Sequence, residues 1–240
     1  MRRNTVFALI SALVFVVTEC VLSYYVQRSD FVTEAMYFAV VLAFVYSMTS
    51  LYITHAVEYN LVRLGLLITL LADYFLVVCS PARQLGGVIV FCFVQMAYFA
   101  ALILTDENRL RRILHIAVRG GLTLLILPIA LIVLGDSVDA LAIFSAVYYV
   151  NLICNMVFAF VDFRKWWLLG IGLFAFALCD ASIGLEFLAN SYLGAKEGGL
   201  IDTIVSSGVN LAWVFYIPCL TLISLSTHFP FRRKGELADN

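Results

Sequence analysis

Two aspartates inside long apolar runs are the residues of this chain whose type and setting favour chemistry. Asp73 lies in the run 66–77 and Asp180 in the run 174–182, each directly after a small residue. A charged carboxylate inside lipid costs at least ~2.5 kcal/mol. Two carboxylates held in one low-dielectric cavity cannot both ionise cheaply, so we expect one of them to keep its proton. A carboxylic acid beside a carboxylate is the pairing that general acid–base catalysis uses.

The same aspartates admit interpretations without catalysis. They can be a hydrogen-bonded buried pair, or two unrelated satisfied residues, with no chemistry. Carboxylates near the membrane midplane also serve as proton relays in transporters. Transporter folds often carry interrupted helices at matching positions of two repeats. Pro128 and Pro218 are the only prolines inside the expected spans, and their positions do not match.

Five further polar residues are expected near the midplane and are candidates for binding a substrate. Gln95 and Tyr98 are three residues apart, and Tyr148, Asn151 and Asn155 share one helix face at i, i+3 and i+7. Such faces are expected to point into the bundle, where polar groups pair or meet water. Interhelical hydrogen bonding is the structural alternative for the asparagines.

The remaining ionisable residues favour no metal chemistry. Arg119 lies near the cytoplasmic end of its expected span. Extending its charge to the interface is favoured over pairing with an acidic residue, and the role of Glu19 stays open. The three histidines, His55, His115 and His228, all fall near interfaces and form no buried ligand triad. A zinc-dependent hydrolase is therefore disfavoured, and we expect neither a metal nor an organic cofactor.

The composition predicts an all-α, polytopic membrane helix bundle. Of the 240 residues, 63% are hydrophobic and 13% are charged, whereas soluble domains have ~45–50% apolar and ~25% charged residues. The apolar runs are long and continuous, which is typical of membrane-spanning helices. The connections are too short for a soluble domain, so residues 1–240 are expected to form one integral membrane domain. The bilayer is the expected partner, and no basic face for nucleic acid is present.

Eight transmembrane helices are expected at ~20 apolar residues per span. Their expected ranges are 5–26, 33–53, 61–79, 85–104, 113–134, 140–161, 166–189 and 201–225. The two aspartates fall in the third and seventh spans, which run in the same direction. A parallel repeat of four spans would place both at similar depth.

Basic residues predict the orientation of these spans. The side with more of them carries Arg2, Arg3, Arg63, Arg109, Arg111, Arg112, Arg164, Lys165, Arg232, Arg233 and Lys234. The other side carries Arg28, Arg83 and Lys196. Because cytoplasmic loops are rich in Lys and Arg, both termini are predicted to be cytoplasmic. A bacterial source would make this an integral protein of the cytoplasmic membrane.

Segments around both aspartates resemble the YhhN-type lysoplasmalogenases, a family of small eight-span membrane proteins. That family has a small residue plus Asp in the third span, a glycine and an F-x-x-x-H-x-x-Y pattern in the fourth, and a second small residue plus Asp in the seventh. The corresponding segments here are LADYFLV at 71–77, GGVIVFCFVQMAY at 86–98 and LGIGLFAFALCD at 169–180. The segment NLAWVFYIP at 210–218 is also similar.

Three positions depart from the family pattern. Ala72 replaces the usual glycine before the first aspartate, and Cys179 replaces the usual serine before the second. Gln95 stands where the family has histidine. Glutamine donates and accepts hydrogen bonds but does not titrate near neutral pH, so a proton carrier at this position would be lost.

The resemblance implies hydrolysis of the vinyl ether bond of a lysoplasmalogen, a lysophospholipid-type substrate that reaches the site laterally from the bilayer. Asp73 and Asp180 would be the catalytic acid and base. Gln95, Tyr98, Tyr148, Asn151 and Asn155 would bind the head group or water. The alternatives are a small proton-coupled transporter and a non-catalytic lipid-binding protein, the latter favoured by Gln95.

Overall fold

The computed structural model describes residues 3–28, 32–79, 81–135, 138–188 and 210–229. All regular elements within these ranges are helices. They are α1 (Arg3–Arg28), α2 (Val32–Thr49), a 3₁₀-helix (Ser50–Tyr52), α3 (Val57–Asp73), a π-helix (Tyr74–Val78), α4 (Gln84–Thr105), α5 (Arg109–Leu134), α6 (Ala140–Val161), α7 (Phe163–Leu188) and α9 (Leu211–Ser226).

The helices have the length and composition of a multi-pass membrane protein. Seven of the described helices, α1 to α7, have apolar stretches long enough to cross a membrane, the α3 stretch including the π-helix. α9 is apolar but has 16 residues. The predicted span 201–225 begins among residues outside the described ranges, and only its second part is seen as α9.

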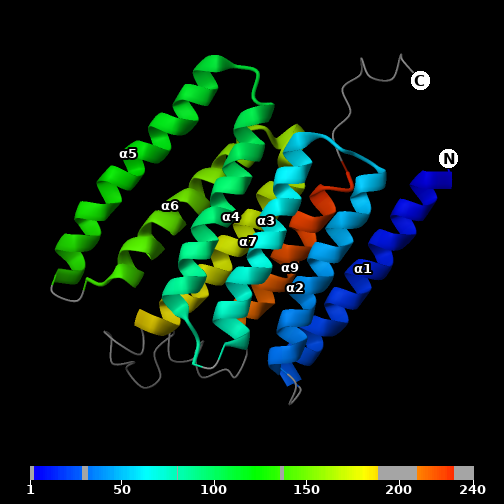
Figure 1. Cartoon of the computed structure of the whole chain (residues 1–240), viewed down its shortest axis with the longest axis horizontal. Coiled ribbons are helices and arrows are strands. Elements are labelled where there is room, and N and C mark those ends of the chain that lie inside the picture. The colour runs from blue at the N-terminus through cyan, green and yellow to red at the C-terminus, as the bar shows by residue number, and fades with distance from the viewer. Residues whose placement is uncertain (1–2, 29–31, 80, 136–137, 189–209, 230–240) are drawn as a thin grey trace.

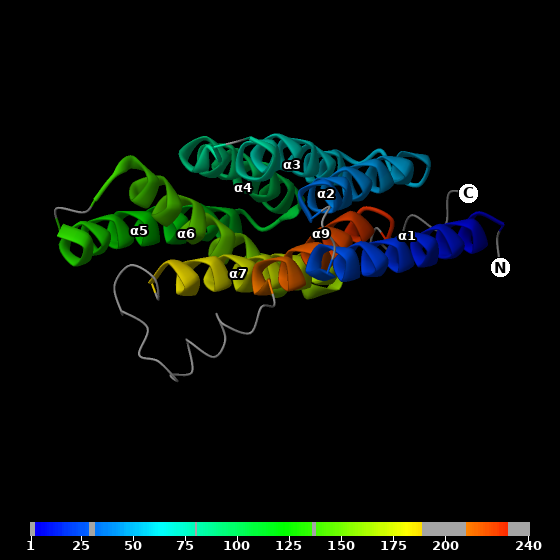
Figure 2. The same cartoon turned by 90° about the horizontal axis from the view of Figure 1, so that it is seen from below.

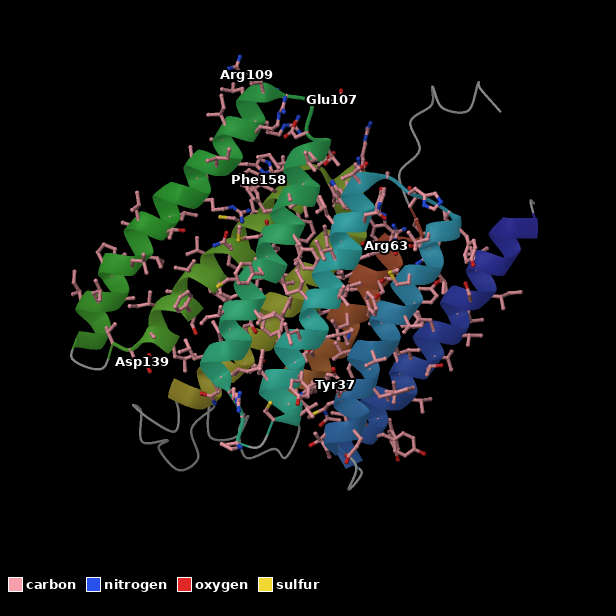
Figure 3. The ribbon with its side chains drawn as sticks, viewed as in Figure 1. Tyr37, Arg63, Glu107, Arg109, Asp139 and Phe158 are labelled. Atoms are coloured by element: carbon pink, nitrogen blue, oxygen red, sulfur yellow. The ribbon has the colours of Figure 1, made fainter. Side chains whose placement is uncertain are left out.

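The helices form two layers that meet in the middle of the bundle (Figures 1 and 2). In Figure 2, α2, α3 and α4 lie above α7, α9 and α1, while α5 and α6 lie together at one side. We call the end of the bundle at which α5 begins the Arg109 end. The opposite end, at which α6 begins, is the Asp139 end (Figure 3).

Helix neighbours repeat between the two halves of the described chain. α3 packs on α4 as α7 packs on α9, and α4 packs on α6 as α9 packs on α2. α1 packs on α2 and α2 on α3, just as α5 packs on α6 and α6 on α7. These neighbour relations are the ones that a parallel repeat of four helices produces.

A change of helix type follows the first aspartate directly. α3 ends at Asp73, and the chain continues as a π-helix over Tyr74–Val78. The wider turn is closed by the hydrogen bond from Cys79 N to Tyr74 O, 3.0 Å long. π-helical turns inside α-helices occur frequently at functional sites, and this one sets how Asp73 is presented to its neighbours.

Arg63 joins α2 to α3 at the Arg109 end of the bundle (Figure 3). Its side chain is buried, and its Nη2 donates to Ser50 Oγ at 2.7 Å and to Thr54 O at 3.0 Å. Nε also donates to Ser50 Oγ at 3.0 Å. The guanidinium thus satisfies backbone and hydroxyl acceptors where α2 ends, and cations are favoured at helix C-termini.

His228 follows the end of α9 and closes the same region. It is only 5% exposed, its ring stacks on Tyr46 with 4.1 Å between centroids, and its Nε2 lies 2.9 Å from Thr49 Oγ1. Burial, assisted by the nearby charge of Arg63, lowers the pKa of His228 to about 4 against the ordinary value of 6.5. The folded protein therefore holds this imidazole neutral.

Acid is expected to destabilise the protein through His228. Between pH 6.5 and pH 4 the unfolded chain binds a proton at this position that the folded chain does not, so the free energy of unfolding falls as the pH falls. The contribution reaches about 3 kcal/mol at pH 4. Thermal unfolding in a non-ionic detergent, measured from pH 7.5 to pH 4, should be less pH-dependent in His228→Phe, which keeps an aromatic ring against Tyr46. The same replacement at the exposed His55 is the matched control, and equal slopes for wild type and His228→Phe would contradict the assignment.

Candidate functional site

The carboxylate of Asp73 accepts a hydrogen bond from a tyrosine on another helix. Tyr216 Oη, on α9, donates to Asp73 Oδ2 at 2.5 Å. Asp73 is 3% exposed and Tyr216 is 4% exposed, so the bond lies in the interior. Hydrogen bonds to a carboxylate are shorter and stronger than those between neutral groups.

Asp180 has a similar partner, provided by a different helix. Tyr148 Oη, on α6, donates to Asp180 Oδ2 at 2.6 Å. Tyr148 is buried, whereas Asp180 is half-buried. Each aspartate is therefore held by one tyrosine hydroxyl from a neighbouring helix, and Tyr148, a predicted binding residue, makes one of these two contacts.

Aromatic rings fill the space between the two pairs. The ring of Phe176, one helical turn before Asp180, lies 5.5 Å from the Tyr216 ring and 6.3 Å from the Tyr148 ring. Phe91 on α4 lies 5.4 Å from Phe176 and 5.7 Å from Tyr148. Both tyrosine–aspartate pairs thus border one cluster of aromatic rings.

A polar network lies beside the second pair and links three helices. Asn155 on α6 donates through Nδ2 to Gln95 O and Gln95 Oε1 on α4, both at 2.9 Å. Arg119 on α5 donates through Nη2 to Asn155 Oδ1 at 2.7 Å and through Nη1 to Asn151 Oδ1 at 2.6 Å. Gln95 and Asn155 are fully buried. The asparagines act here as interhelical contacts, the alternative noted above.

The expectation that Arg119 extends to the interface is wrong. Its side chain turns into the bundle because two amide oxygens on α6 are positioned to accept from it, and its Cζ lies 4.0 Å from the centroid of the Phe99 ring. The sequence shows the position of Arg119 along its span, but it does not indicate that Asn151 and Asn155 face α5.

The predicted site residues thus fall into three sets. Tyr148 binds Asp180, whereas Gln95, Asn151 and Asn155 belong to the network of Arg119. Tyr98 is buried and packs on the backbone of α3, where a side-chain carbon at Gly65 would collide with its ring. Tyr216 was missed as a site residue, although it lies in the segment 210–218 that carries part of the resemblance.

The chemistry that this arrangement offers is proton transfer. Within the described ranges, no group of three or more His, Cys, Asp or Glu side chains could hold a metal ion. A tyrosine donor on Oδ2 fixes the orientation of each carboxyl group and leaves Oδ1 to carry a transferable proton. Two carboxyl groups oriented in this way, one protonated and one ionised, can act as acid and base.

The chain matches no protein-family model, no curated protein and no solved structure. Inferences about its function therefore depend on the residues and their geometry.

Proposed function

We propose that this chain is an eight-span integral membrane hydrolase that cleaves the vinyl ether bond of lysoplasmalogens, with both termini cytoplasmic. α1 begins and α9 ends at the Arg109 end of the bundle (Figure 1), which supports an even number of passes. The basic residues of the loops at this end support its cytoplasmic location. The family resemblance supplies the substrate class.

The observation that carries the proposal is the pair of tyrosine-bound aspartates around Phe176. A protonated aspartate gives its proton to the β-carbon of the vinyl ether, and the double-bond electrons form the new C–H bond. The resulting oxocarbenium ion is stabilised by the ionised partner. Water then adds to the cationic carbon while the carboxylate takes its proton. The hemiacetal collapses to a fatty aldehyde and a glycerophospho-head group, so the reaction consumes one water.

The test is aldehyde release by the purified full-length protein in detergent, with a lysoplasmalogen as substrate. Protonation at carbon predicts that the reaction in D₂O places one deuterium at C2 of the aldehyde. The product is reduced at once to its alcohol, so that C2 does not exchange further with the solvent. The 1-O-alkyl analogue lacks the double bond and should give no product. Absence of aldehyde, or product without deuterium at C2, would reject the mechanism.

A non-catalytic lipid-binding protein is the second candidate. Gln95 favours it, because this residue replaces a titratable histidine of the family pattern and commits its Oε1 to Asn155. This candidate predicts that lysoplasmalogen binds and is recovered intact. Gln95→His would then be the variant in which turnover is sought.

A further inference from the structure

Arg119 carries a positive charge inside the bundle that its partners among the described residues do not neutralise. Its Nη atoms are held by the side-chain oxygens of Asn151 and Asn155, and its Cζ lies over the ring of Phe99. These contacts within the described residues are to neutral groups, which orient the guanidinium but leave its net charge. Charged side chains inside membranes are costly and mark binding sites or pathways by default.

The same network leaves hydrogen-bond donors without partners. Among the described residues, the buried Nε of Arg119 and the buried Nε2 of Gln95 make no hydrogen bond. Gln95 is 0% exposed and is connected to Arg119 through Asn155. Both groups are donors only. A net positive charge with free N–H donors suits an anion that has several acceptor oxygens, and arginine is well suited to phosphate.

The network lies next to the Asp180 pair along α6. Asn151 and Asn155 follow Tyr148 by three and seven residues, which places them about 4.5 and 10.5 Å further toward the Arg109 end. Arg119 itself lies ten residues after the start of α5, about 15 Å from that end. Arg109 and Asp139, labelled in Figure 3, mark the two ends between which the network lies.

We propose that Arg119, held by Asn151 and Asn155, binds the phosphate of a lysolipid head group. This inference rests on the proposed function and names the part of the substrate that the site recognises. In a lysoplasmalogen the phosphorus lies five bonds from the vinyl ether oxygen, roughly 6 Å when extended. A phosphate at Arg119 would therefore place the vinyl ether beside Tyr148 and Asp180. The head group points to the Arg109 end and the alkenyl chain to the Asp139 end.

The surface of α5 beside Arg119 is open to the bilayer. A side-chain carbon at Gly120 or Gly121 would meet no atom within 4 Å. Most side chains of α5 are at least partly exposed, and its exposed residues include Ile116, Leu122 and Leu125. A lipid can thus approach the guanidinium from the bilayer along the edge of the bundle.

The test compares two lipids that cannot be hydrolysed, so it does not require turnover. The first is a 1-O-alkyl lysophosphatidylcholine, and the second is the corresponding 1-O-alkylglycerol without phosphate. Equilibrium binding of labelled lipid to the full chain in a non-ionic detergent should favour the phospholipid by at least about tenfold. Arg119→Gln should remove this preference and leave the affinity for alkylglycerol unchanged. Arg112→Gln, an exposed arginine of the same helix, is the matched control.

Asn151→Asp separates recognition from folding. Among the described residues, Asn151 Nδ2 donates to Val147 O of its own helix, and that carbonyl is also within the backbone hydrogen bonding of α6. A carboxylate at this position loses the Nδ2 bond but gains an ion pair with Arg119, which already contacts Asn151 Oδ1. The melting temperature should be unchanged or higher, while the preference for the phospholipid falls. Equal affinities for the two lipids in wild type, or an unchanged preference in Arg119→Gln or Asn151→Asp, would overturn the proposal.

Inorganic phosphate distinguishes a lipid head group from a free anion. Phosphate alone is expected to bind much more weakly than the lipid, because it lacks the alkyl chain, whose burial adds to the affinity of the lipid. An equal affinity would overturn the assignment to a lipid. Selective binding of the phospholipid without aldehyde release would reject the hydrolase and support the phosphate site. Aldehyde release without this selectivity would support the hydrolase and reject the phosphate site.

Discussion

Lysoplasmalogen turnover is expected to fall by about 10²- to 10⁴-fold in both Asp73→Asn and Asp180→Asn, the range that general acid–base catalysis contributes. Asparagine keeps a side-chain oxygen that can accept from Tyr216 or Tyr148, so the helix contacts should persist. It can neither give a proton to carbon nor carry the negative charge that stabilises the oxocarbenium ion. The measurement is the initial rate of aldehyde release, with thermal unfolding recorded for each variant.

Glu19→Gln is the matched control for these two variants. Glu19 is also a buried carboxyl group, 1% exposed, and it lies on α1, outside the helices that carry the two aspartates. Its two oxygens make no hydrogen bond within the described residues. Turnover should be close to that of wild type. Activity surviving in both aspartate variants would remove the pair from the mechanism, and an equal loss in Glu19→Gln would show that the effect is not specific to the two aspartates.

Gly172→Leu is expected to disrupt both stability and turnover, because α7 and α9 approach each other closely at Gly172. A side-chain carbon at this position would lie 2.8 Å from Ile223 Cγ1 and 3.2 Å from the backbone oxygen of Cys219. The backbone of α9 cannot yield as a side chain does, so the helices must separate. Overpacking of this kind costs about 1–3 kcal/mol. Tyr216, one turn from Cys219, would also move away from Asp73.

Gly184→Leu provides the control on the same helix. A side-chain carbon at Gly184 would meet nothing within 4 Å, so this variant should keep the melting temperature and most of the activity. The pair is measured by thermal unfolding in detergent together with aldehyde release. Similar behaviour of the two leucine variants would contradict the close contact of α7 and α9.

Helix positions could be predicted from the sequence because membrane spans are long apolar runs. The expected spans 85–104 and 140–161 agree with α4 and α6 within one residue. The continuation of the third span as a π-helix could not be predicted, because the apolar run is uninterrupted through Asp73. The starts of α5 and α6 could also be predicted. Asn108 and Asp139 lie in polar loops, and their side chains accept from backbone N–H groups of the first helical turn.

Partners of the polar residues were harder to predict than their depth. Spacing placed Tyr148, Asn151 and Asn155 on one helix face, but their partners are on three different helices, α7, α5 and α4. Tyr216 and Arg119 were missed because a bond between residues 143 apart in the chain, or 32 apart, depends on how helices pack. A single sequence carries periodicity within a helix but little information about which helix faces which.

The π-helix after Asp73 has a consequence for how this segment can change during evolution. Such a turn equals one extra residue in an α-helix. Deleting one residue from Tyr74–Val78 would leave Asp73 in place but convert the wide turn into an ordinary α-helical turn. Leu76 would then leave its contact with Gly87, at the start of α4. Homologues that keep this site should therefore vary the identity of these residues more readily than their number.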